Sequence, residues 1–111
     1  MQGVRSEANI LNDCMIALSQ AGARVFRNNT GVLKDKTGRP VKFGLCKGGS
    51  DIIGICPDGK FLAVECKTEK GRATDHQLRF IEIVRQMGGR AGIARRADDA
   101  VRILNGEQLD P

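Results

Sequence analysis

The chain of 111 residues is about the size of one compact domain, and its hydrophobic fraction of 41% and charged fraction of 28% exclude a disordered chain or a disulfide miniprotein. Its 18 Lys and Arg residues exceed its 13 Asp and Glu residues, so the formal net charge of +5 favours polyanionic partners such as nucleic acids. Aromatic residues make up 4% of the chain, without Tyr or Trp, which argues against a protein that stacks single-stranded bases. We expect a single domain over residues 1–111; charge alone is equally compatible with a basic surface that binds no nucleic acid.

Four cysteines and one histidine do not predict a zinc site. The cysteines show no C-x-x-C spacing, and His76 alone cannot complete a Cys/His set of the usual form. Arg5, Glu7 and Asn9 interrupt the apolar segment that a secretory signal would need, and no apolar run is long enough to span a bilayer. We therefore expect a cytoplasmic protein with reduced thiols and no membrane contact.

A helix is predicted over residues 6–21, where apolar residues recur at helical spacing before Gly22. Following the apolar stripe back from Ile10 and Leu11 reaches Glu7, which places a carboxylate on the inward side of the first turn. Residues 23–28 are typical of a short strand.

The segment 31–50 is rich in Gly and Lys, and Asp35 is its only acidic residue. Two β-like fragments, residues 32–33 and 41–43, flank the turn-prone residues 35–38, which predicts a flexible basic hairpin. A solvated surface loop is the alternative.

The second half of the chain predicts a hairpin, a helix, a strand and a final helix. Strand-like residues 51–56 and 61–67 flank a Pro-Asp-Gly turn. Thr74 then begins a helix, with Gln77 in capping-box position and, four residues before Ile81, on the inward apolar stripe. A strand over 91–94 and a helix over 97–104 follow.

The turn chemistry also predicts the register of the 51–67 hairpin. If Gly59 occupies a bulge, Lys60 pairs with Cys56, and Asp51 lies opposite Glu65. Lys67 is two residues beyond Glu65 and points to the same face of the strand. Two carboxylates and one lysine therefore converge.

Two opposed carboxylates repel each other, and a hard cation such as Mg²⁺ would compensate them while coordinating phosphate oxygens. Together with a lysine that positions or deprotonates water, such a site indicates phosphodiester hydrolysis. A plainer alternative is an exposed ion pair between Glu65 and Lys67 on an edge strand, with Asp51 capping the start of its own strand. The apolar residues 61–64 favour a central strand over an edge strand.

These residues resemble a known nuclease pattern. Ser50-Asp51, thirteen intervening residues and Glu65-Cys66-Lys67 resemble the PD-(D/E)xK motif, although Ser50 stands where the motif has proline. With Gly48-Gly49 before Ser50 and Gln77 on the next helix, the chain resembles the VRR-NUC branch of that superfamily. The phage or prophage type of this branch would place the protein in a bacterial or phage-infected host cell.

The resemblance implies an α/β fold, with a restriction-endonuclease-like α-β-β-β-α-β core in which helices flank a central mixed sheet. It implies that Asp51, Glu65 and the backbone carbonyl of Cys66 hold Mg²⁺ or Mn²⁺, while Lys67 assists the water. Glu7 would match the family's first-helix acid, as a ligand reached directly or through water. Gln77 would belong to the catalytic set, with ordinary helix capping as the alternative.

Basic and polar residues around these motifs are candidates for contacts with the DNA backbone. Arg72 and Thr74 precede or begin the second predicted helix, whose N-terminal amides favour phosphate. The other candidates are Lys47, Ser50, Lys70 and Asn28. Each basic residue is as well explained as a solubilising charge.

The function expected from this resemblance is a Mg²⁺- or Mn²⁺-dependent deoxyribonuclease selective for branched DNA such as flaps, bubbles or Holliday junctions. A small core leaves no room for an elaborate sequence-reading domain, and paired cuts would require a homodimer. The sequence does not indicate whether a helicase or replication protein is a partner. The alternatives are a non-catalytic basic nucleic-acid-binding module on the same fold and a regulatory protein with an incidental acid cluster.

Overall fold

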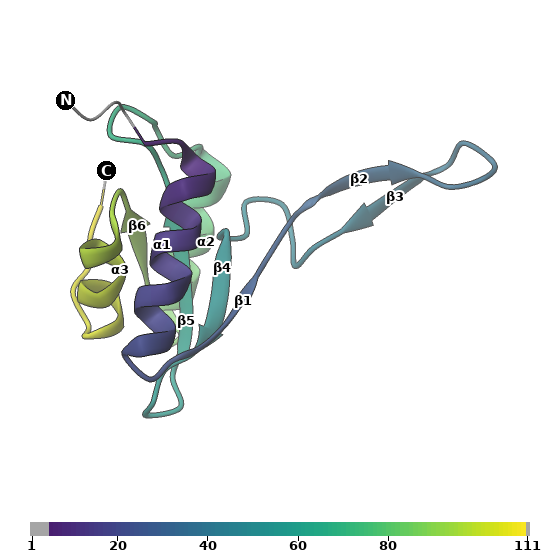
Figure 1. The fold of residues 1–111 in the computed structure, drawn as a ribbon. Helices are drawn as coiled ribbons and strands as arrows, with labels where there is room; N and C mark the ends of the chain where they lie inside the picture. The colour runs from purple at the N-terminus through teal and green to yellow at the C-terminus, as the bar shows by residue number, and fades with distance from the viewer. Residues whose placement is uncertain (1–4, 111) are drawn as a thin grey trace.

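Three helices and six strands form along residues 5–110, the part of the chain that the computed structural model describes (Figure 1). In chain order they are α1 (Glu7–Gln20), β1 (Arg24–Arg27), β2 (Gly31–Lys34), β3 (Pro40–Phe43), β4 (Ile52–Ile55), β5 (Phe61–Cys66), α2 (Asp75–Gln86), β6 (Arg90–Ala94) and α3 (Ala97–Leu104). With the β2–β3 hairpin set aside, the order is the predicted α-β-β-β-α-β core followed by a final helix. The expected α/β fold class is confirmed.

The central sheet has the strand order β1-β4-β5-β6. The β1–β4 and β4–β5 pairs are antiparallel, whereas β5 and β6 are parallel, so the sheet is mixed. Strand β5 lies inside the sheet, and every residue after Phe61 is buried, as expected of a strand that is covered on both faces. Its last residues, Glu65 and Cys66, therefore lie at the rim of the core.

Helices cover both faces of the sheet (Figure 1). On one face, α1 and α3 pack on Leu62, Val64 and Cys66. On the other face, α2 packs on Ala63 and Ile93. Because side chains alternate along a strand, Glu65 belongs to the same face as Ala63, and Cys66 to the face of α1.

The turn between β4 and β5 has the hydrogen bonds that its sequence predicts. The Cys56 amide donates to the Lys60 carbonyl at 2.8 Å, and Gly59 adopts a φ of +89° that suits glycine. Ile55 pairs with Phe61 and Ile52 with Val64. The predicted register is confirmed, and its continuation places Asp51 opposite Glu65.

The basic segment forms a hairpin, as predicted, and not an irregular loop. Among the strands of residues 5–110, β2 and β3 pair only with each other and make a second sheet. This hairpin extends away from the helices and the central sheet (Figure 1).

The structure also bears on the expected state of the cysteines and on membrane-spanning helices. All four cysteines are free thiols. None of the helices within residues 5–110 is both long and apolar enough to cross a membrane.

Two isoleucines of β4 provide a test of the core. Ile52 is fully buried, whereas the side chain of Ile55 is 50% exposed. We expect Ile52→Ala to lower the free energy of unfolding by about 2–5 kcal/mol, because it leaves a cavity in the core, and Ile55→Ala by about 1 kcal/mol or less. Urea denaturation of both variants checks this, and equal losses would contradict the assigned packing.

Candidate active site and metal centre

Asp51 and Glu65 face each other where the β4–β5 ladder ends. The hydrogen bond between Cys56 and Lys60 makes that pair a hydrogen-bonded one, so alternation along the ladder makes Asp51 and Glu65 a non-hydrogen-bonded pair. Side chains approach most closely at such pairs. Strand β4 begins only at Ile52, and the Asp51 carboxylate accepts a hydrogen bond from the Cys66 amide at 2.9 Å. Asp51 thus caps the strand and also faces Glu65.

Glu7 brings a third carboxylate to this pair from the first turn of α1. Carboxylate oxygens of Glu7, Asp51 and Glu65 all lie within 4.8 Å of one another. Glu7 is exposed, yet its carboxylate lies beside the buried Glu65, which agrees with its predicted inward position on the helix. It lines a small cleft of about 160 Å³ together with Asp51 and Arg27.

Glu65 is a buried acid with incomplete partners. Its side chain is 1% exposed, its Oε2 lies 3.6 Å from Lys67 Nζ, and its Oε1 has no hydrogen-bond partner among residues 5–110. Burial, followed by the negative charge of Asp51, raises the pKa of Glu65 to about 8. Lys67 opposes this shift only in part.

The three carboxylates fit a divalent cation. A buried carboxylate oxygen without a partner is costly, and a bound cation would satisfy it while offsetting the repulsion among the acids. Lys67 completes the group as a half-buried cation beside Glu65. The expected convergence of two acids and one lysine is therefore observed, and the alternative of an exposed ion pair on an edge strand is not.

The backbone of Cys66, and not its thiol, lies on the side of Asp51. The amide and carbonyl of a strand residue point to the same side, so the Cys66 carbonyl points toward the side on which its amide meets Asp51. The thiol lies on the opposite face of β5, where contact with Cys14 and burial raise its pKa. It therefore stays protonated at neutral pH.

Two residues that are expected to touch DNA, Asn28 and Ser50, take part in the support of Asp51. Asn28 Nδ2 donates to the Ser50 carbonyl at 3.0 Å, Asn28 Oδ1 accepts from the Leu45 amide at 3.1 Å, and the Asn28 amide donates to the Asp51 carbonyl at 2.7 Å. Ser50 itself is fully buried, so the expected direct contact of its side chain with DNA is not compatible with this structure.

The start of α2 forms the predicted capping box. The Thr74 hydroxyl accepts from the Gln77 amide, and the Thr74 amide donates to Gln77 Oε1 at 2.9 Å. The side-chain oxygen of Gln77 is thus used in capping, which leaves its amide nitrogen for any contact with substrate or water. The capping box also occupies two of the helix-end amides expected to bind phosphate. The remaining candidates, Lys47, Lys70 and Arg72, are exposed.

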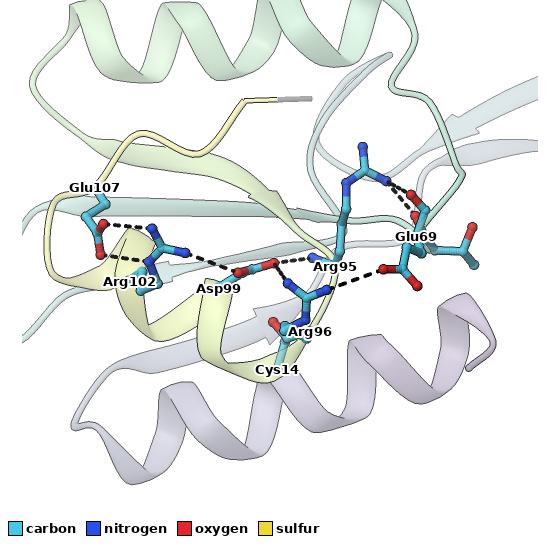
Figure 2. Close-up of polar contacts among 8 residues, drawn as sticks. Cys14, Glu69, Arg95, Arg96, Asp99, Arg102 and Glu107 are labelled. Carbon is cyan, nitrogen blue, oxygen red and sulfur yellow. Dashed lines mark hydrogen bonds and ion pairs between the residues drawn. The ribbon is translucent and has the colours of Figure 1, made fainter. Parts of the chain in front are cut away.

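Arg95 is a supporting residue that the sequence did not indicate (Figure 2). Its Nη1 donates to the carbonyls of Thr68, Glu69 and Gly71, in the loop that follows Lys67. Its own amide donates at 3.0 Å to Asp99, a largely buried acid on α3. A single arginine after a strand has no distinguishing sequence pattern, so only the fold reveals this role.

Comparisons with known proteins identify the family to which this chain belongs. The model of the VRR-NUC domain family matches residues 16–98. The chain belongs to the VRR-NUC family, which is a family of nucleases. A solved structure described as a VRR_NUC domain aligns with a TM-score of 0.61 and 22% sequence identity, covering 90% of this chain and 95% of that one. No curated protein sequence matches. The family match includes Asp51, Glu65, Lys67 and Gln77, whereas Glu7 lies outside it.

The buried acid of this VRR-NUC domain predicts how stability depends on pH. The folded protein binds the Glu65 proton more tightly than the unfolded chain, since the pKa rises from 4.5 to about 8. In EDTA, the contribution of Glu65 to the free energy of unfolding should be greatest below pH 4.5 and decline, by a few kcal/mol at most, as the pH rises to about 8. Urea denaturation across this range measures it.

Glu65→Gln should flatten this pH dependence, because the amide does not titrate. Glu82→Gln, at an exposed position on α2, is the matched control and should keep the wild-type profile. Parallel profiles for wild type and Glu65→Gln would show that the Glu65 pKa is not raised.

Two neighbouring arginines test the support of the 68–71 loop. Arg95→Gln removes three hydrogen bonds to carbonyls, so we expect a loss of about 1–3 kcal/mol in the free energy of unfolding and faster amide exchange over residues 68–72. Arg96→Gln is the control, since Arg96 is 60% exposed and its ion pairs are 3.7 and 3.8 Å long. Equal amide exchange in the two variants would refute the supporting role of Arg95.

Proposed function

We propose that this VRR-NUC domain is a Mg²⁺- or Mn²⁺-dependent endonuclease that hydrolyses phosphodiester bonds of DNA. The observation that carries the proposal is the buried Glu65 carboxylate, which has one unpartnered oxygen and lies among Asp51, Glu7 and Lys67. A fold that only binds nucleic acid gains nothing from burying such a costly acid.

Each residue of the site has a distinct proposed role. Asp51, Glu65 and the Cys66 carbonyl would hold the ion, and Glu7 would complete its shell directly or through water. When bound, the ion would supply positive charge for the phosphate and lower the pKa of a coordinated water.

Lys67 would act on the attacking water. Its ammonium is held beside Glu65 and is only 12% exposed, so it can orient a water molecule by donating hydrogen bonds and can stabilise negative charge on phosphate. The Gln77 amide nitrogen would orient the same water or the substrate, while its oxygen keeps α2 capped.

We further propose that the substrate is branched DNA and that the active form is a homodimer. Within residues 5–110 one acidic group of this kind is present, so one chain can cut one strand at a time. Paired cuts at a junction require a second active site, which a symmetric dimer supplies. Lys47, Lys70 and Arg72 would add contacts with the phosphate backbone.

A panel of labelled flap, bubble, junction, duplex and single-stranded DNA tests this proposal with Mg²⁺ and with Mn²⁺. We expect wild type to cleave at least one branched substrate, and Lys67→Ala to reduce the rate roughly 100-fold or more. Lys60→Ala is the matched control, because Lys60 lies directly before β5 and Lys67 lies directly after it. The Lys60→Ala variant should retain the activity.

Calorimetry with Mn²⁺ separates metal binding from catalysis. Wild type and Lys67→Ala should bind the ion, whereas Asp51→Asn should lose most of the affinity. Equal cleavage by wild type and folded Lys67→Ala, or equal absence of Mn²⁺ binding by wild type and Asp51→Asn, would contradict the proposal. A strict monomer in sedimentation would exclude paired cuts and leave nicking.

A further inference from the structure

Most of the net charge of the protein lies in the segment that we call the arm, residues 29–47, which contains β2, β3 and their flanks. The arm holds five of the 18 basic residues and one of the 13 acidic residues, and therefore four of the five net positive charges. The rest of the chain is close to neutral. The basic character of this protein is thus a local property of its projecting hairpin (Figure 1).

The positive charges of the arm are not neutralised within the protein. Across residues 5–110, ion pairs involve arginines of the core such as Arg85, Arg90 and Arg102, and none of the five basic side chains of the arm. Asp35, the one acid, accepts hydrogen bonds from Thr37 and from the Arg39 amide, which lower its pKa. It therefore forms the turn and makes no ion pair with a neighbouring lysine.

The strand register divides the arm into two different faces. Val32 pairs with Lys42 and Lys34 with Pro40, so Lys34 and Lys42 share one face. Lys36 and Arg39 lie at the tip, in or beside the turn. The other face carries Leu33, Val41 and Phe43, which are all exposed.

The shape and reach of the arm suit a DNA duplex. At roughly 3.3 Å per residue, the four strand residues from Gly31 to Lys34 extend about 13 Å from the base of the arm, and the turn lies beyond them. A two-stranded ribbon is an element that the major groove admits, and this reach is comparable to the groove width of about 12 Å.

The base of the arm is fastened to the active site. Asn28 joins the two ends of the arm by its bonds with Leu45, Ser50 and the Asp51 carbonyl. A hollow of about 510 Å³ runs from Lys42 past Lys47 to Gly48. There the backbone packs against His76 on α2, where a Cβ added to Gly48 would meet the His76 carbonyl at 2.5 Å. The hydrogen bonds of Asn28 and the packing of Gly48 therefore fix the direction of the arm relative to Asp51.

We propose that the arm is a DNA-holding ribbon, in which Lys34, Lys42 and the basic tip bind phosphates of the duplex that flanks the cleaved bond. The proposal rests on the proposed nuclease function, which supplies DNA as the polyanion. These contacts are independent of base sequence, because phosphates carry no sequence information. The alternative is that a second copy of the chain binds to the apolar face of the arm.

Two double variants with the same net charge test this assignment. Lys34→Gln/Lys42→Gln removes two charges from the arm, and Arg24→Gln/Lys60→Gln removes two exposed charges from the end of the sheet that lies away from Asp51. Fluorescence anisotropy with labelled duplex and flap DNA, in EDTA to prevent cleavage, measures affinity at several salt concentrations. Thermal melting and Mn²⁺ calorimetry verify that both variants keep the fold and the metal site.

We expect the arm variant to bind both DNAs roughly 10-fold or more weakly, with the slope of log affinity against log salt reduced by about two, and the control to stay within a few-fold of wild type. Equal losses in the two variants would overturn the proposal, because bulk charge would explain them. If the arm variant binds DNA as the control does while Leu33→Ser dissociates a dimer in sedimentation, the arm holds a second copy and the proposal is wrong. If wild type cleaves no DNA with Mn²⁺, the nuclease proposal fails, and the anisotropy comparison still decides the role of the arm.

Discussion

The opposition of Asp51 and Glu65 across β4 and β5 is the contact on which the rest of the site depends. The turn that contains Gly59 determines the register, and the register brings two acids together at a non-hydrogen-bonded pair. A slip of one residue would move Glu65 to the face of α1 and the Cys66 thiol into the site. The chemistry of the molecule therefore depends on a turn at the far end of the hairpin.

The sheet and its covering helices bury Glu65, which makes the charged form of its carboxyl group unfavourable. Glu65 lies on a strand that is buried on both faces, so little water reaches its carboxylate, and within the described part of the chain Lys67 is the one cation paired with it. Burial and the neighbouring acids favour its protonated form, and a divalent cation would reverse that preference. The same packing that stabilises β5 thus leaves a buried carboxylate oxygen that a bound cation would satisfy.

Local sequence patterns predicted the parts of the fold whose causes are local. The Pro-Asp-Gly turn, the Thr74 capping box and the helix that begins at Ala97 depend on neighbouring residues, and all three are observed. The burial of Ser50 and the exposure of Glu7 depend instead on which elements pack around them. Arg95 was missed for the same reason, because its three acceptors lie at least 24 residues away along the chain.

The arm enters and leaves the core at adjacent points. Gly31 pairs with Phe43 at its base, and Asn28 closes the two ends with hydrogen bonds to the loop before β4. An insertion whose ends already touch can change in length without altering the spacing of the elements that it joins. The hairpin can therefore be lengthened, shortened or replaced while Asp51 keeps its place, so the reach of the arm and the chemistry of the site are separable properties of this fold.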